Sequence, residues 1–151
     1  MGFETIVIIL QTVGPFTVLV TVYFLVTELK EQNRVARANA RQNMADSHQK
    51  LTLAGLNKDI VKIKVKLRKG EELDEEENSI YLTHFTAILR ARQNQHYQYV
   101  IGMLDEEEWI AMLSSFRTLL RDKKNLEIWD WVSPTFPKNF VKLVEEQRNK
   151  I

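Results

Sequence analysis

The sequence contains no cysteine, and only three prolines and five glycines among its 151 residues. Without cysteine there is no thiolate to bind a metal, and the composition fits a domain in the cytoplasm. The three histidines, His48, His84 and His96, show neither the Glu-x-x-His nor the His-x-x-x-His spacing of a helical metal site. The sequence therefore predicts no metal site and no cofactor.

Motifs of the common catalytic classes are also missing. There is no G-x-S-x-G nucleophile turn, no phosphate-binding loop and no dinucleotide fingerprint. The acidic run Glu106-Glu107-Glu108 is more typical of a helix N-terminus than of a catalytic pair. The sequence thus predicts a protein that is not an enzyme, with no catalytic residues.

Charged side chains are absent from residues 5–27, a stretch that starts almost at the first methionine. About 20 apolar residues in a helix match the ~30 Å hydrocarbon core of a bilayer. A secretory signal peptide has instead a basic start, a shorter apolar region and a small-residue cleavage site. Here the preceding tail, residues 1–4, carries only Glu4, and no such site follows. The sequence predicts an uncleaved transmembrane helix over 5–27.

Basic residues flank this span on one side only. Lys30, Arg34, Arg37 and Arg41 follow it, and no Lys or Arg precedes it. Because basic flanks stay in the cytoplasm, we expect a single pass with the N-terminus outside and the remainder of the chain in the cytoplasm.

Charge is unevenly distributed beyond the span. Residues 28–70 hold 11 Lys/Arg and 4 Asp/Glu, a net +7, whereas residues 71–151 hold 10 and 15, a net −5. Anionic lipids attract basic segments near a membrane, so the basic half suits membrane lipid as a partner. The acidic distal half argues against nucleic acid.

The remaining chain is predicted to be all-α. Residues 28–54 contain no Pro or Gly and consist largely of good helix formers, so the transmembrane helix is expected to continue into a juxtamembrane helix over 28–56. A small helical bundle should follow over 57–148, before a tail at 149–151. Its helices are expected at 58–69, from the acidic segment 71–78 to about 103, at 105–120, after Asn125, and around Phe140.

Helix ends in this domain are predicted from capping residues. Asn57 and Gly70 would cap the helix over 58–69, and Asp105 with Glu108 fits a capping box. Asn125 would cap the short helix that carries Ile128 and Trp129.

The segment 58–69 is ambiguous between helix and strand. Apolar residues alternate with bases, as in a strand, but Ile60, Ile63 and Leu67 also fit a helix face. A helix is favoured because no partner strand is visible. Its bases suggest either a solvated face or contact with anionic lipid; they are Lys62, Lys64, Lys66, Arg68 and Lys69.

Arg92 and His96 are the only candidates for a polar site on the apolar stripe of the helix that ends near residue 103. Four residues apart, they share one helix face, with Gln93 and Tyr99 nearby. They would either join a structural hydrogen-bond network, the favoured interpretation, or bind an anion. Such a network would be closed by Tyr81, Tyr97, Gln93 or a distal acid.

Several segments together resemble an uncharacterised family of bacterial single-span membrane proteins with a cytoplasmic helical domain. They are Asn57-Lys58-Asp59-Ile60, Arg90 to Asp105 (RARQNQHYQYVIGMLD), Trp109, Trp129-Asp130-Trp131 and Phe136-Pro137-Lys138-Asn139-Phe140. The resemblance implies a bacterial inner-membrane setting and no assigned activity. Gln93 stands where that pattern has a Glu, which puts an Arg–Glu pairing in doubt.

The sequence therefore favours a membrane-anchored, non-enzymatic helical interaction module, an adaptor or accessory subunit. We expect a protein partner or a homo-oligomer, and the three tryptophans suit a core and a docking surface. One alternative is a ligand sensor or enzyme with a site near Arg92 and His96. Another is an anionic-lipid binder acting through 58–69.

Overall fold

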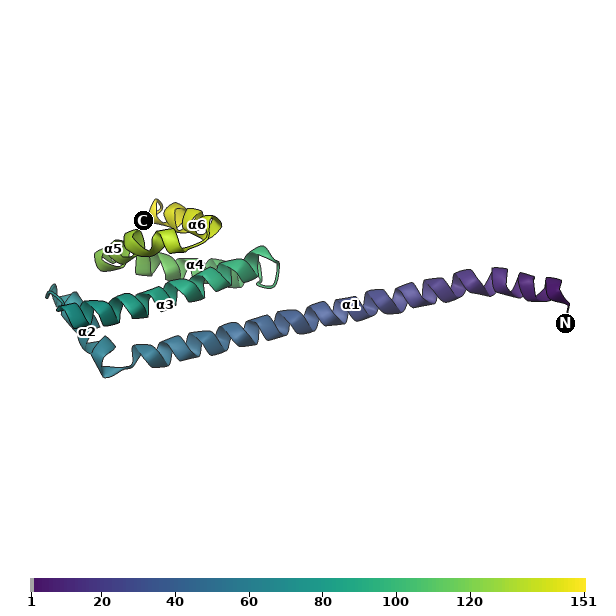
Figure 1. The fold of residues 1–151 in the computed structure, drawn as a ribbon, viewed down its shortest axis with the longest axis horizontal. Helices are drawn as coiled ribbons and strands as arrows, with labels where there is room; N and C mark the ends of the chain where they lie inside the picture. Colours follow the sequence, from purple (N-terminus) through teal and green to yellow (C-terminus); the bar gives the residue numbers. More distant parts are fainter. Residues whose placement is uncertain (1) are drawn as a thin grey trace. The chain divides into compact units, whose positions relative to one another are not determined.

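The computed structural model describes residues 2–151, with the backbone alone at residues 5, 6, 9, 10 and 12. Every element in this described part of the chain is helical. The predicted all-α class is therefore confirmed, with one long N-terminal helix followed by a helical bundle (Figure 1).

The first helix, α1, runs without interruption from Phe3 to Gly55 and includes Pro15. The predicted tail over 1–4 is thus already helical at Phe3, and Met1 lies outside the described residues. From Val13 onward α1 contains an 18-residue window with a mean hydropathy of 1.4, none of it buried. It is long and apolar enough to span a membrane. The Thr17 and Thr21 hydroxyls donate to carbonyl oxygens four residues back, at 3.1 and 2.8 Å, so neither needs an external acceptor.

The chain divides into two compact units, Met1–Asn39 and Ala40–Ile151. The boundary lies inside α1, so the folded domain begins at Ala40 and not at the predicted residue 57. The reason is that α1 contributes side chains to the domain after this point. Met44 packs against the hydrophobic core, and the Arg41 Nε donates to Glu108 Oε1 at 2.9 Å.

The ambiguous segment is the helix α2, Lys58–Lys69, capped as predicted. The Asn57 side chain accepts from the Asp59 amide at 2.8 Å, and Gly70 has the left-handed φ of 72° that suits glycine at a helix C-terminus. Ile60 and Ile63 are buried, which explains why the helical face prevails over the alternating pattern.

Four α-helices and a short 3₁₀ helix complete the domain. They are α3 (Glu75–Val100), α4 (Glu106–Leu120), α5 (Lys123–Val132), η1 (Ser133–Thr135) and α6 (Lys138–Arg148). The predicted helices at these places are confirmed, and the prolines at 134 and 137 lie at the turn between α5 and α6.

Two predicted caps are wrong. Asp105 occupies the N-cap position of α4 but makes no side-chain cap hydrogen bond, because it and Glu108 lie beside Arg41. The capping box forms instead at α3, where Asp74 accepts from the Glu77 amide and Glu77 accepts from the Asp74 amide. Likewise Asp122, not Asn125, caps α5.

Asn125 is buried and forms hydrogen bonds with two neighbouring helices. It accepts a hydrogen bond from the Tyr81 hydroxyl at 2.9 Å and donates to the Leu119 carbonyl at 2.9 Å. This buried pair ties α3, α4 and α5 together at one end of the bundle, and burial raises the pKa of Tyr81 to about 12.

The hydrophobic core lies between α3, α4, α5 and α6. Its residues are large and fully enclosed, and the aromatic rings contact one another: Phe116 and Phe140 lie 6.3 Å apart, and Trp129 and Phe140 6.0 Å. The side chains with the least exposure are Ile63 of α2 and, in the other helices, Phe85, Leu89, Phe116, Leu120, Trp129, Phe140 and Val144.

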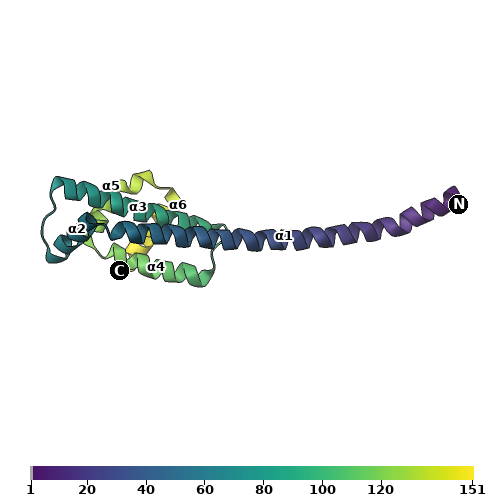
Figure 2. The same cartoon turned by 90° about the horizontal axis from the view of Figure 1, so that it is seen from below.

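Within the second unit the helices form layers. The part of α1 after Ala40 runs along the outer face of α3 and α4, antiparallel to α3, while α5 and α6 cover the opposite face (Figures 1 and 2). The helix α2 closes one end. Unlike α5 and α6, this part of α1 is mostly exposed and buries no residue fully.

Candidate functional site

A hollow of about 370 Å³ lies where the end of α1 meets α2, α3 and α4. Its apolar lining comes from leucines of α1 and α4 together with Ile88 and Ala91 of α3. Its polar lining is neutral or basic. The residues around it are Ser47, His48, Leu51, Thr52, Gly55, Leu56, Lys64, His84, Ile88, Ala91, Arg92, Gln95, Ser115 and Leu119.

Among the described residues, no acid lines this hollow, whereas Lys64, His84 and Arg92 all do. The three come from two helices, and Lys64 Nζ approaches Gly55 closely enough to lie 3.4 Å from where a Cβ at that position would be. The hollow is therefore a concentration of basic groups on a partly apolar wall.

Arg92 is half-buried and has no carboxylate partner. It donates to Gln95 Oε1 at 2.9 Å and makes a weak contact with Ser115 Oγ at 3.5 Å. Burial lowers the pKa of the guanidinium, because removing a cation from water disfavours its charged form. A buried charge normally has a counter-charge, so Arg92 is under-satisfied in this fold.

His84 is a second unsatisfied group in the same hollow. Its Nε2 is buried and has no hydrogen-bond partner in the structure. Burial, and secondarily the positive charge of Lys64, lower the pKa of the imidazole. A buried polar atom without a hydrogen-bond partner is rare in folded proteins.

His96 does not share this hollow with Arg92. Its ring stacks on Trp109 at a centroid distance of 5.5 Å and lies 6.0 Å from Phe140, and burial lowers its pKa. The two residues therefore do not form one site as predicted. His96 lies toward the core between α3, α4 and α6, whereas Arg92 lies at the hollow. The spacing of four residues could not show that the side chains of Arg92 and His96 pack against different helices.

Gln93 and Tyr99 lie apart from Arg92 as well. Gln93 lines a different hollow, together with His96, and accepts a hydrogen bond from Arg90 Nη1 at 3.0 Å. That bond replaces the Arg–Glu pairing put in doubt by the sequence. Tyr99 stacks on Trp109 at 4.6 Å, and its hydroxyl donates to Glu106 Oε2 at 2.6 Å.

The predicted closing partners of Arg92 are also wrong. Tyr81 is bonded to Asn125, Gln93 is bonded to Arg90, and Tyr97 is 57% exposed. Gln95 and Ser115 take their place, and no distal acid is involved.

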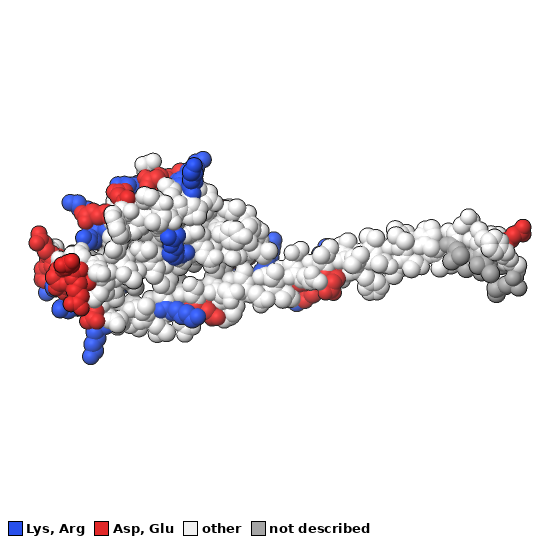
Figure 3. All heavy atoms as spheres, in the orientation of Figure 1, with Lys and Arg blue, Asp and Glu red and all other residues white. Residues whose placement is uncertain are grey.

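The bases of α2 are divided between acids and the hollow. Lys66 Nζ donates to the buried Glu77 at 2.7 Å, Lys62 lies 3.7 Å from the same carboxylate, and Lys69 lies 3.7 Å from Glu71. Arg68 reaches back to the Lys64 carbonyl. On the face drawn in Figure 3, acidic side chains gather at the end where α2 meets α3. The segment therefore forms a surface of mixed sign, which weakens the lipid interpretation.

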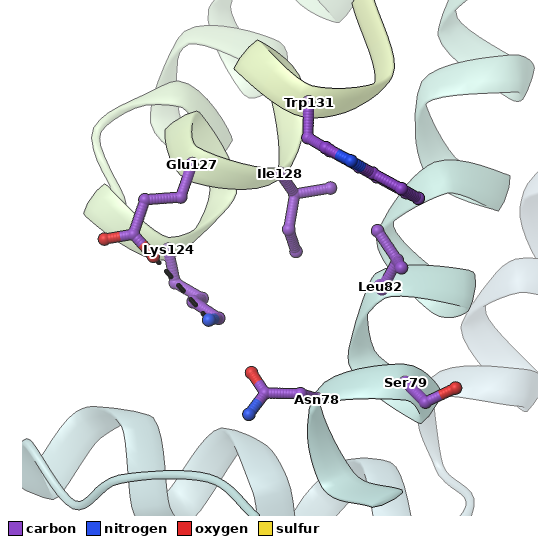
Figure 4. Close-up of a pocket in the computed structure, with 7 residues that line it drawn as sticks. All are labelled: Asn78, Ser79, Leu82, Lys124, Glu127, Ile128 and Trp131. Carbon is purple, nitrogen blue, oxygen red and sulfur yellow. Dashed lines mark ion pairs between the residues drawn. The ribbon is translucent and has the colours of Figure 1, made fainter. Parts of the chain in front are cut away.

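A smaller groove of about 240 Å³ lies between α3 and α5. Trp131, Ile128 and Leu82 supply its apolar side chains, and Asn78 and Ser79 lie opposite (Figure 4). The ion pair between Lys124 and Glu127, 3.6 Å apart, lies at its rim. Trp131 is 71% exposed, whereas Trp109 and Trp129 are 6% and 0% exposed.

The sequence pointed to Arg92 but not to its real surroundings. His84 and Ser115 were missed because they face the hollow only through the packing of α1 and α4 against α3. The signal available in sequence was weak: His84 and Arg92 are eight residues apart, a helical repeat of about two turns.

Comparisons with protein families, with characterised proteins and with solved structures found no match to this chain. Within the described residues, no three His, Cys, Asp or Glu side chains are grouped so as to hold a metal ion.

Proposed function

We propose that this chain is a membrane-anchored, non-enzymatic interaction module. In this proposal α1 anchors the protein in a bacterial inner membrane, and the helical domain binds a protein partner in the cytoplasm. The observation that carries the proposal is the exposed Trp131 beside the groove between α3 and α5.

The composition of the groove suits a protein partner. Tryptophan is enriched among the few residues that dominate binding energy at interfaces, and a 71% exposed indole leaves a large apolar area in water. The volume of about 240 Å³ is below the roughly 300–1,000 Å³ typical of small-molecule pockets. The groove therefore fits one apolar anchor side chain, presented by an amphipathic segment of the partner.

The proposed orientation rests on the bases that follow the span. Lys30, Arg34, Arg37 and Arg41 lie within about 15 residues of its end, where basic residues determine topology. A reporter that is active only in the cytoplasm, fused after Ile151, should be active. Activity of a periplasm-only reporter at that site would contradict the orientation.

Site-specific photo-crosslinking in native membranes tests the partner. A photoreactive residue in place of Ser79, on the groove, should give one discrete adduct, and Trp131→Ala should abolish it. Ile110→Ala is the matched control, because Ile110 is 57% exposed and does not line the groove. Trp131→Ala should leave the folded domain intact, since exposed substitutions usually change stability by about 0.5 kcal/mol or less.

Two results would contradict the proposal. One is the absence of any adduct from position 79. The other is an adduct that survives Trp131→Ala. An adduct with twice the mass of the chain would show that a second copy, and not another protein, occupies the groove.

A further inference from the structure

The hollow at the end of α1 shares no lining residue with the groove at Trp131. We infer that it binds a small organic anion: a carboxylate or phosphate group held by Arg92, Lys64 and His84, with an apolar body against α1 and α4. The site is separate from the groove at Trp131, so the inference stands independently of the proposed function.

Positive charge in the hollow is not balanced by its lining. Lys64, His84 and Arg92 line one hollow, and none of the residues around it is acidic. Some bases elsewhere in the domain are paired with carboxylates, as Lys66 is with Glu77 and Arg148 with Asp130 at 2.7 Å. The lining of the hollow offers no such carboxylate to Lys64 and Arg92, and an anion would supply that counter-charge.

The polar side chains of the hollow keep unused hydrogen-bonding capacity. The Arg92 guanidinium uses one nitrogen for Gln95 and another only weakly, at 3.5 Å, for Ser115. The buried His84 Nε2 has no partner at all. A planar guanidinium with free donors matches the oxygens of a carboxylate or phosphate, which accept two parallel hydrogen bonds.

The volume and lining of the hollow suit a small molecule. About 370 Å³ is within the range of small-molecule pockets, which combine apolar walls with a few polar groups. Leu51, Leu56 and Leu119 provide such a wall. The ligand class is therefore an amphiphilic anion larger than inorganic phosphate, either free in the cytoplasm or the headgroup of a lipid.

The test uses the full chain in phosphatidylcholine nanodiscs, titrated with hexyl phosphate and hexanoate and, as the uncharged analogue, hexanol. Binding is measured by calorimetry and by NMR of the histidine side chains. Both anions should bind saturably and hexanol should not. The pKa of His84 should rise on binding, because a nearby anion favours the charged imidazole.

Variants locate the site. Arg92→Met should weaken binding by about tenfold or more, the value of one or more charge-assisted hydrogen bonds. Lys142→Met is the matched control, because that lysine is exposed on α6 and far along the chain from the hollow; it should bind within about twofold of the parent chain.

Ser115→Asp is a second variant that tests the same site, and it can be used if Arg92→Met folds poorly. It places a carboxylate where Ser115 Oγ now contacts Arg92, so it should abolish anion binding and raise the melting temperature. Nanodiscs containing phosphatidylglycerol distinguish the two sources: a shift of the His84 signals without added ligand would identify a lipid headgroup as the anion.

Three results would overturn the inference. They are no saturable binding of either anion at millimolar concentration, equal binding of hexanol, or binding unchanged by both Arg92→Met and Ser115→Asp.

Discussion

The two faces of the α3–α4 pair are built from different side chains. Toward α5 and α6 they carry Phe85, Phe116 and other fully enclosed apolar residues. Toward α1 they carry Arg92, His84 and Ser115 around an open hollow. One face is enclosed and apolar, and the other is polar and has incompletely satisfied hydrogen-bonding groups. The difference suggests that the first face holds the domain together and the second is free to serve binding.

The largest expected effect comes from the filled face. Phe116→Ala should lower the free energy of unfolding by about 3–5 kcal/mol, because it removes a fully buried ring and leaves a cavity. Leu51→Ala, on α1 beside the hollow, should cost about 1 kcal/mol or less. Chemical denaturation of the full chain in zwitterionic micelles, followed by tryptophan fluorescence, compares the two. Equal losses would show that α1 packs as tightly as α5 and α6.

Arg92→Met tests the polar face. The replacement removes a half-buried charge that has no carboxylate partner, so the free energy of unfolding should stay the same or rise by about 1 kcal/mol. The same denaturation experiment measures it. A loss of several kcal/mol would mean that Arg92 is held in a complete structural network, and the two faces would then differ less than described.

Asp74→Ala should cost about 1 kcal/mol, because it breaks the capping box at the start of α3. Asp105→Ala is the control at the equivalent position of α4, where the aspartate makes no side-chain cap hydrogen bond, and it should cost less than half as much. Thermal melts followed by circular dichroism suffice. A larger effect at Asp105 would restore the cap predicted there from sequence.

The smallest effect is a pH dependence of stability. Burial lowers the pKa of His84 and His96 below the ordinary value of 6.5 in the folded chain, so the unfolded chain takes up more protons below that pH. Stability should therefore fall as pH is lowered through 6.5. The pKa of Glu77 is lowered mainly by its hydrogen bond with Lys66. Protonation of this carboxylate should therefore reduce stability only as the pH falls below about 4.5.

His84→Gln should reduce the slope of the stability profile between pH 7 and 5.5, with His96 supplying the slope that remains, as measured by denaturation at several pH values. His48→Gln is the control, because His48 is exposed at the rim of the hollow. A profile that keeps its full slope in His84→Gln would show that His84 is not the group responsible.

Much of the fold was predictable because its signals are local. An uncharged stretch, good helix formers without Pro or Gly, and the caps Asn57 and Gly70 each act over a few residues. The capping error at Asp105 shows the limit, because a distant base, Arg41, draws both acids of the expected box away from the helix end.

The candidate site was harder to predict because it depends on packing between helices. Arg92 and His96 share a helix face in sequence, yet the crossing of α4 and α6 places His96 against Trp109 and leaves Arg92 under α1. The sequence also could not show that Trp129 is buried and Trp131, two residues later, is exposed. That difference depends on how α5 packs against the other helices.

Native-state hydrogen exchange of the full chain in phosphatidylcholine nanodiscs tests the contrast between the two faces most directly. Amides in the middle of α3, α4 and α5 should exchange only through global unfolding, and those of residues 44–55 in α1 through smaller openings with a lower free energy. Hexyl phosphate should protect residues 44–55 and leave the core helices unchanged. Uniform protection across α1 and the core helices, with no response to the anion, would contradict the account.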